Sequence, residues 1–159
     1  MFHKLAPPLF AVLCVMAFGA AAQPVVSYVK ANAKFEDVRD DLKTAIEAKG
    51  LVIDYQSHIA AMLERTGKDV GSTKPVYADA QALLFCSARL SRKMMEADPA
   101  NVVMCPYTIV VYATASKPDR VVVAYRPPAQ PAGSPASKAA LKEVAALLDG
   151  IAREAVGRK

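Results

Sequence analysis

Two cysteines, Cys86 and Cys105, are the side chains of this sequence best suited to chemistry. A third cysteine, Cys14, lies in an apolar stretch that we expect to be removed from the mature chain. An even number of cysteines in an oxidising compartment makes a disulfide the first hypothesis. Two alternatives stay open: a buried pair of thiols that pack as small hydrophobes, and a working redox or metal-binding pair.

A second candidate set combines sulfur with imidazole. His58 and Met62 are four residues apart, a spacing that puts them on one face of a helix. Together with Cys86 and Cys105 they make a donor set that suits copper(I) or haem iron. Methionine is also a common filler of hydrophobic cores, so core packing is the competing interpretation. A three-histidine zinc site is excluded, because His58 is the only histidine expected in the mature chain.

Tyrosines gather on the last predicted hairpin. Tyr107, Tyr112 and Tyr125 lie there, and Arg126 follows directly. Because tyrosine and arginine are enriched at interfaces, Tyr107 and Arg126 are candidates to border a pocket or a contact surface. Packing of the tyrosines across neighbouring strands is the alternative.

No recognised catalytic set accompanies these residues. Ser57 is next to His58, but the sequence contains no nucleophile-elbow pattern, no glycine-rich phosphate loop and no dinucleotide-binding fingerprint. We therefore assign no catalytic residues. The sequence leaves enzymatic activity open and favours a protein without one.

The elements that must position these residues follow from the spacing of apolar side chains. Helical spacing predicts helices over residues 35–49, 57–65, 88–97 and 134–156. Alternation and β-branched runs predict strands over residues 24–31, 51–57, 81–86, 102–113 and 120–125. We expect Ile59, Met62 and Leu63 of the second helix to point inward. The order of elements predicts an α+β fold, a two-layer sandwich of a mostly antiparallel sheet with two main helices on one face.

The first 22 residues have the pattern of a signal peptide. A short charged start is followed by an apolar run over residues 5–18, and Ala20 and Ala22 fit the small positions before a cut at Gln23. The apolar run is shorter than the roughly 20 residues that a membrane span needs. We therefore expect a periplasmic or secreted protein, cleaved near Ala22-Gln23, without a stable membrane span. A retained membrane anchor is the alternative.

The mature chain is expected to form one domain over residues 23–127. A proline-rich connector follows over residues 128–135, and a C-terminal helix over residues 136–159 packs on the domain or on a partner. Removing residues 1–22 takes away one lysine and leaves 19 basic against 15 acidic side chains, a net charge of +4. These charges are scattered and form no basic face with stacking aromatics, so we expect no nucleic-acid partner.

Several segments together resemble the family called domain of unknown function 302. The segments are FEDV at 35–38, LLFCSA at 83–88, ADP at 97–99 and CPYTIVVY at 105–112. The resemblance implies a compact domain with two main helices on an antiparallel sheet, often paired as a dimer. It implies no activity. Relative to shorter members of the family, this chain has extra sequence over residues 57–80 and a proline-rich tail with an added helix.

The sequence thus predicts an exported periplasmic protein that acts as a non-catalytic small-ligand-binding or protein-interaction module, with a homodimer as the candidate assembly. The candidate binding residues are Cys86, Cys105, His58, Met62, Tyr107 and Arg126. The leading hypothesis requires no cofactor. The alternative is a thiol-redox or soft-metal- or haem-handling protein that uses Cys86 and Cys105, with copper or haem as its cofactor.

Overall fold

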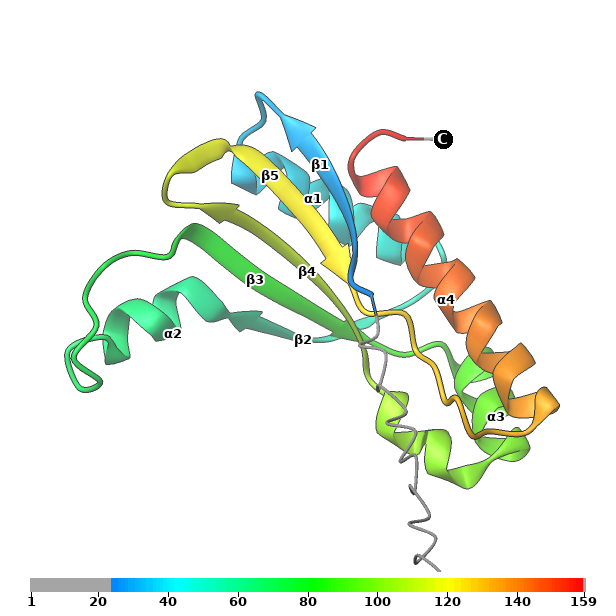
Figure 1. The fold of residues 1–159 in the computed structure, drawn as a ribbon. Helices are drawn as coiled ribbons and strands as arrows, with labels where there is room; N and C mark the ends of the chain where they lie inside the picture. Colours follow the sequence, from blue (N-terminus) through cyan, green and yellow to red (C-terminus); the bar gives the residue numbers. More distant parts are fainter. Residues whose placement is uncertain (1–23, 159) are drawn as a thin grey trace, which may run out of the picture.

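The computed structural model describes residues 24–158, so the predicted signal peptide over residues 1–22 lies outside the described residues. The strands are β1 (Val26–Ala31), β2 (Ile53–His58), β3 (Tyr77–Phe85), β4 (Tyr107–Thr114) and β5 (Lys117–Tyr125). The helices are α1 (Phe35–Glu47), α2 (Ile59–Thr66), α3 (Ala88–Ala97), the 3-10 helix η1 (Pro99–Met104) and α4 (Pro135–Ala155). Figure 1 shows their arrangement.

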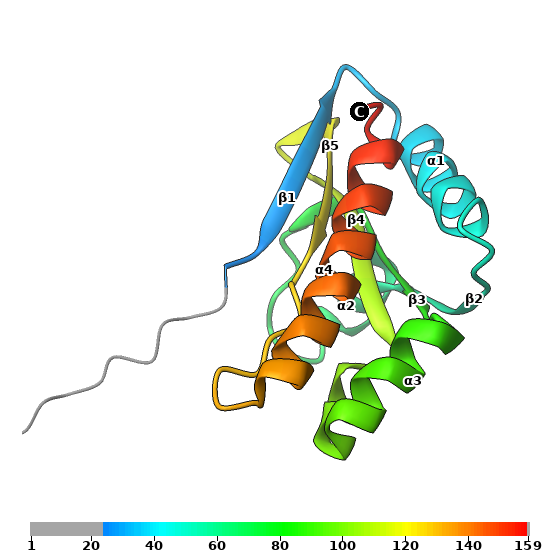
Figure 2. The same ribbon diagram turned by 90° about the vertical axis from the view of Figure 1, so that its right-hand side faces the viewer.

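The five strands form one antiparallel sheet in the order β1-β5-β4-β3-β2. Helices α1 and α4 lie side by side on one face of this sheet, and α3 packs against α4 (Figure 2). The predicted α+β fold is therefore confirmed. Within residues 24–158, no helix is both long enough and apolar enough to cross a membrane.

The core lies between the sheet and this helix layer because both contribute apolar side chains at the matching periods. Along β4, alternate residues beginning with Tyr107 are buried, whereas Thr108 and the residues in phase with it face the other way. Helix α1 buries its apolar stripe, including Val38, Leu42 and Ile46. Helix α4 buries a longer stripe: Leu141, Val144, Leu148, Ile151 and Ala155.

The start of α4 is set by its first residues. Ser134 accepts a hydrogen bond from the backbone N–H of Ser137 at 3.1 Å, which satisfies one of the free donors of the first turn. Pro135 occupies the first turn, where its missing N–H costs nothing. The helix predicted from residue 134 therefore begins where Ser134 caps it.

Residues 102–106 were expected to continue a strand, and this prediction is wrong. They belong to η1 and to the turn that follows it. Asp98 caps η1 by accepting a hydrogen bond from the backbone of Ala100, and Pro99 starts the helical turn. This local capping outweighs the strand preference of the exposed Val102 and Val103, which gain no burial from either conformation.

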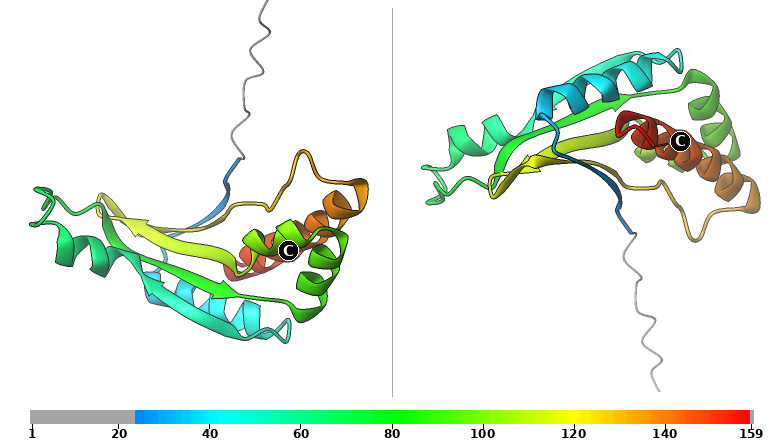
Figure 3. Two further views of the ribbon diagram at one scale, coloured as in Figure 1. Left: turned by 90° about the horizontal axis from the view of Figure 1, so that it is seen from below. Right: turned by 90° about the horizontal axis from the view of Figure 1, so that it is seen from above.

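The inward orientation of the α2 side chains was also predicted wrongly. No residue of α2 is buried, and Met62 and Leu63 are 41% and 39% exposed. The reason is the position of α2, which continues from the edge strand β2 and contacts the start of β3. Figure 3 shows α2 and α3 at opposite ends of the sheet, so the helix layer does not cover α2.

A disulfide joins Cys86 to Cys105, with 6.5 Å between their Cα atoms. The antiparallel register explains it, because Phe85 at the end of β3 pairs with Tyr107 at the start of β4. Cys86 follows this pair by one residue and Cys105 precedes it by two, so their side chains lie close enough to bond. The predicted disulfide is confirmed, and it closes the segment that carries α3 and η1.

Replacing both cysteines (Cys86→Ser with Cys105→Ser) is expected to lower the free energy of unfolding by about 3 kcal/mol, because the reduced unfolded chain regains the loop entropy. Urea denaturation monitored by circular dichroism measures this change. As a control, dithiothreitol should destabilise the wild-type protein by a similar amount and leave the double variant unaffected. An unchanged midpoint in the double variant would show that the disulfide does not stabilise this fold.

Candidate functional site

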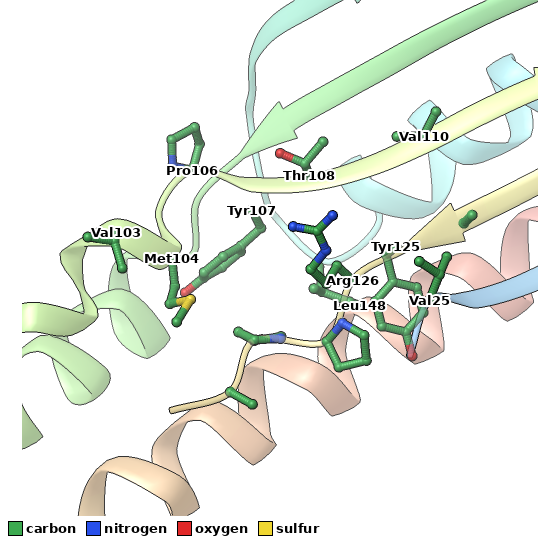
Figure 4. A pocket seen from close by; sticks show the side chains of 14 residues that line it. Val25, Val103, Met104, Pro106, Tyr107, Thr108, Val110, Tyr125, Arg126 and Leu148 are labelled. Carbon is green, nitrogen blue, oxygen red and sulfur yellow. The ribbon is translucent and has the colours of Figure 1, made fainter. Parts of the chain in front are cut away.

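A cavity of about 590 Å³ lies at the end of the sheet where β4 begins and β5 ends (Figure 4). Its walls come from six parts of the chain: Val25 before β1, η1 with the turn after it, the start of β4, the end of β5, the connector after β5, and Leu148 of α4. The lining residues are Val25, Val103, Met104, Pro106, Tyr107, Thr108, Val110, Ala124, Tyr125, Arg126, Pro127, Pro128, Ala129 and Leu148. Most of these side chains are apolar.

Arg126 is positioned by strand alternation and by the proline that follows it. Side chains alternate along β5, so Tyr125 faces the helices while Ala124 and Arg126 face the open side of the sheet. Pro127 restricts the residue before it to extended backbone. Arg126 therefore continues the direction of β5 and presents its guanidinium to the cavity, as Figure 4 shows.

Tyr107 forms part of the inner wall. It is buried, and its ring meets Phe85 edge to face with 6.0 Å between the ring centres. Its hydroxyl lies 2.9 Å from the hydroxyl of Ser91. Burial raises the pKa of the Tyr107 hydroxyl. Ser91 Oγ also lies 3.7 Å from Cys105 Sγ, so this wall is continuous with the disulfide.

Tyr125 forms the opposite wall and belongs to a polar cluster centred on Asp149 of α4. The Asp149 carboxylate accepts hydrogen bonds from the hydroxyls of Tyr28 and Tyr125 and from Nε of Arg153. These donors, Tyr28 foremost, hold the pKa of Asp149 below its usual range. Burial and the hydrogen bond to Asp149 raise the pKa of the Tyr125 hydroxyl. The cluster ties β1 and β5 to α4.

A second polar link joins η1 and the connector to α4. Asn101 is fully buried and donates from Nδ2 to the carbonyl of Met94 and to Ser137 Oγ, both at 2.8 Å. Ser137 in turn donates to Gln130 Oε1 at 3.1 Å. Among residues 24–158 the other amide atom of this side chain, Asn101 Oδ1, has no hydrogen-bond partner. Because buried polar groups are costly unless paired, the bonds that Nδ2 does make hold η1 and the connector in place.

Arg126 carries the cavity's charge. Among residues 24–158, no other charged side chain, basic or acidic, lines the cavity. Arg126 makes no ion pair within the part of the chain that the structure describes, residues 24–158. The cavity is thus an apolar concavity with one available cation.

Of the candidate residues from the sequence, the structure brings Tyr107 and Arg126 into this one cavity and bonds Cys86 to Cys105 beside it. His58 lies elsewhere, because it ends β2 and pairs with Gln81, five residues before Cys86. Five residues of strand span about 16 Å. Met62 lies farther along, on α2.

The sulfur and imidazole groups therefore do not converge. Both cysteine sulfurs are bonded to each other, and His58 and Met62 are at the other end of the sheet. Within residues 24–158, no three His, Cys, Asp or Glu side chains are grouped so as to hold a metal ion. The structure offers no assembled donor set of the kind that the copper or haem hypothesis requires.

Other residues of the cavity were missed in the sequence. Val103 and Met104 lay in a segment predicted as strand, and Pro127 and Pro128 were taken only as a connector boundary. The i,i+4 spacing of Asp149 and Arg153 is visible in the sequence, but their bonding to two tyrosines is not. No local signal indicates these contacts, because they join segments far apart in the chain.

Comparison with known proteins gives a family and a fold. Residues 27–155 match the family described as "Domain of unknown function DUF302", and the match includes α4. The crystal structure of an uncharacterized conserved DUF302 protein from Bacillus stearothermophilus is similar, with a TM-score of 0.65 and 14% sequence identity. The similarity covers 80% of this chain and 96% of that chain. A search of curated proteins found no significant match.

At this level of identity the crystal structure supports the fold alone. The family match spans most of the chain and agrees with the segments noted in the sequence. The chain therefore belongs to the DUF302 family of domains of unknown function.

Proposed function

We propose that this protein is an exported, non-catalytic module that binds a small, mainly apolar molecule in the cavity beside β4 and β5. The observation that carries the proposal is the cavity itself. Its volume of about 590 Å³ lies within the usual range for small-molecule sites, and its walls are mostly apolar with few polar groups.

The walls are held in place before any ligand arrives. The disulfide fixes the start of β4, the Asp149 cluster fixes Tyr125, and Asn101 fixes η1 against α4. A site that is already ordered loses less conformational entropy on binding. This order supports the proposal that the cavity is a binding site and not an incidental gap between loops.

The hydroxyl groups of the cavity favour binding over catalysis. Those of Tyr107 and Tyr125 are bonded to Ser91 and Asp149, and both have a raised pKa. A raised pKa disfavours the deprotonated form, so neither hydroxyl is set up to act as a general base.

Filling the cavity is expected to abolish binding of an apolar dye. Thr108 is an exposed strand residue that lines the cavity, so Thr108→Trp should occupy the space without disturbing the core. The measurement is saturable fluorescence of the neutral dye Nile red, which we expect to be at least tenfold weaker in this variant. Thr73→Trp, in an exposed loop, is the matched control and should bind as the wild type does. Equal binding by all three proteins would contradict the proposal.

Export is the second part of the proposal and rests on the signal-peptide pattern of residues 1–22. We expect protein made in a Gram-negative host to be recovered from the periplasm with a mass that begins at Gln23. Leu13→Arg should interrupt the apolar run and leave an uncut protein inside the cell. Recovery of the wild-type protein from membranes with residues 1–22 still attached would instead indicate a retained anchor.

We also propose that two copies pair through the open face of the sheet. The register places Val29, Val122 and Tyr112 side by side in an uncharged row on this face. A two-fold interface brings identical surfaces together, so contact through this uncharged row avoids the repulsion that the like charges of Arg120 and Arg126 on the same face would cause.

This pairing predicts that Val122→Arg converts a dimer into a monomer, because a two-fold interface would bring two buried arginines close together. Light scattering coupled to size-exclusion chromatography measures the molar mass. Val70→Arg, at a position that is 73% exposed after α2, is the control and should leave the dimer intact. A wild-type protein that is monomeric at all concentrations would refute the pairing.

Thiol–disulfide exchange at Cys86 and Cys105 is a second candidate function. Ser91 favours it, because its hydroxyl lies 3.7 Å from Cys105 Sγ and is placed to donate to a Cys105 thiolate after reduction by a dithiol. Both cysteines are only half-buried. The double serine variant separates the two functions: dye binding with lower stability fits the binding module, whereas loss of dithiol-dependent reduction of a second protein's disulfide fits exchange.

A further inference from the structure

We propose that the cavity takes an aliphatic monocarboxylate, with the carboxylate at Arg126 and the tail against the apolar walls. The inference rests on the proposed binding function and specifies the chemical class of the ligand. Its basis is the combination of one unpaired cation with a lining that is otherwise uncharged.

The charge of the site selects an anion. The guanidinium of Arg126 has no acidic partner among residues 24–158, and no acidic residue lines the cavity. A guanidinium presents two parallel N–H groups that match the two oxygens of a carboxylate. A carboxylate at this position would supply the partner that the protein itself lacks.

The geometry places this cation where a ligand head can reach it. Arg126 and Thr108 face the same, open side of the sheet, and in Figure 4 the guanidinium of Arg126 points toward Thr108. Pro127 holds the backbone of Arg126 extended, which limits the positions that its side chain can reach. The Thr108 hydroxyl is a second group able to donate to a carboxylate oxygen at this end.

The remaining lining suits a hydrocarbon tail. Aliphatic side chains come from four different segments: Val25, Val103, Met104, Val110 and Leu148. Burial of methylene groups in such surroundings removes apolar surface from water and favours binding. A tail gains from these walls, whereas the many hydroxyl groups of a sugar would lose their hydrogen bonds to water.

Other anions fit less well. A phosphate monoester carries up to two negative charges and many acceptor oxygens, but the lining has one cation. A free amino acid adds an ammonium group, which would need an acceptor of opposite charge that the lining does not contain. The match of one cation to one negative charge therefore favours a simple carboxylate.

The test compares decanoate with decan-1-ol, which has the same tail without the charge. Displacement of Nile red from the full mature chain measures both affinities. We expect decanoate to bind about tenfold more tightly than decan-1-ol, as a charge-assisted hydrogen-bonded pair implies. Arg126→Gln should lower the affinity for decanoate by about tenfold and leave the affinity for decan-1-ol unchanged.

Arg120→Gln is the matched control. Arg120 lies on β5 and faces the same side of the sheet as Arg126, but it does not line the cavity. This variant should bind both probes as the wild type does, and Arg126→Lys should restore part of the decanoate affinity that Arg126→Gln loses.

Two results would overturn the inference, and they have different meanings. If decanoate and decan-1-ol bind equally and Arg126→Gln changes neither affinity, the ligand class is wrong while the binding function stands. If neither probe displaces the dye and Thr108→Trp binds the dye like the wild type, the proposed function itself is wrong.

Discussion

The packing of α4 against the sheet is the constraint on which the rest of the structure depends. Its buried stripe lies beside α1 and over β1 and β5, and its first turn contacts η1 through Ser137 and Asn101. Because α4 starts beyond the end of the sheet, the connector from β5 must cross that end to reach it (Figure 1). The cavity exists because this crossing segment, η1 and the strand ends meet without filling the space between them.

Polar contacts determine the orientation of α4 on the sheet. Hydrophobic burial is nearly indifferent to orientation, whereas a carboxylate bonded to two hydroxyls and a guanidinium accepts few arrangements. Asp149 makes these bonds across β1, β5 and its own helix, and it thereby sets how α4 lies on the sheet. Arg153 and Arg158 lie over the ring of Tyr28, with 5.0 and 5.6 Å to the ring centre, and reinforce the same contact.

The cavity combines walls that hydrogen bonds hold in place with one charged side chain, that of Arg126. The hydroxyls of Tyr107 and Tyr125 form hydrogen bonds with Ser91 and Asp149. Arg126 is exposed to solvent and, like Arg65 and Arg120, forms no ion pair among residues 24–158. Its position distinguishes it from the other two, because it lines an apolar cavity.

The sequence by itself determined the helices that carry strong periodicity and the mostly antiparallel sheet, because each depends on neighbouring residues or on adjacent strands. It made the disulfide between Cys86 and Cys105 the first hypothesis, and the register of β3 and β4 decided it. The sequence pattern wrongly predicted strand for part of η1, where capping by Asp98 prevailed over the strand preference of Val102 and Val103. It also wrongly predicted buried side chains on α2, which no other helix covers. Only the tertiary structure decided that Tyr107 and Arg126 line one cavity while His58 lies elsewhere. It also decided that Asp149 accepts a hydrogen bond from Tyr28, which is 121 residues away in the sequence. Such contacts arise from the packing of whole elements, and no local pattern of residue types encodes which loops that packing brings together.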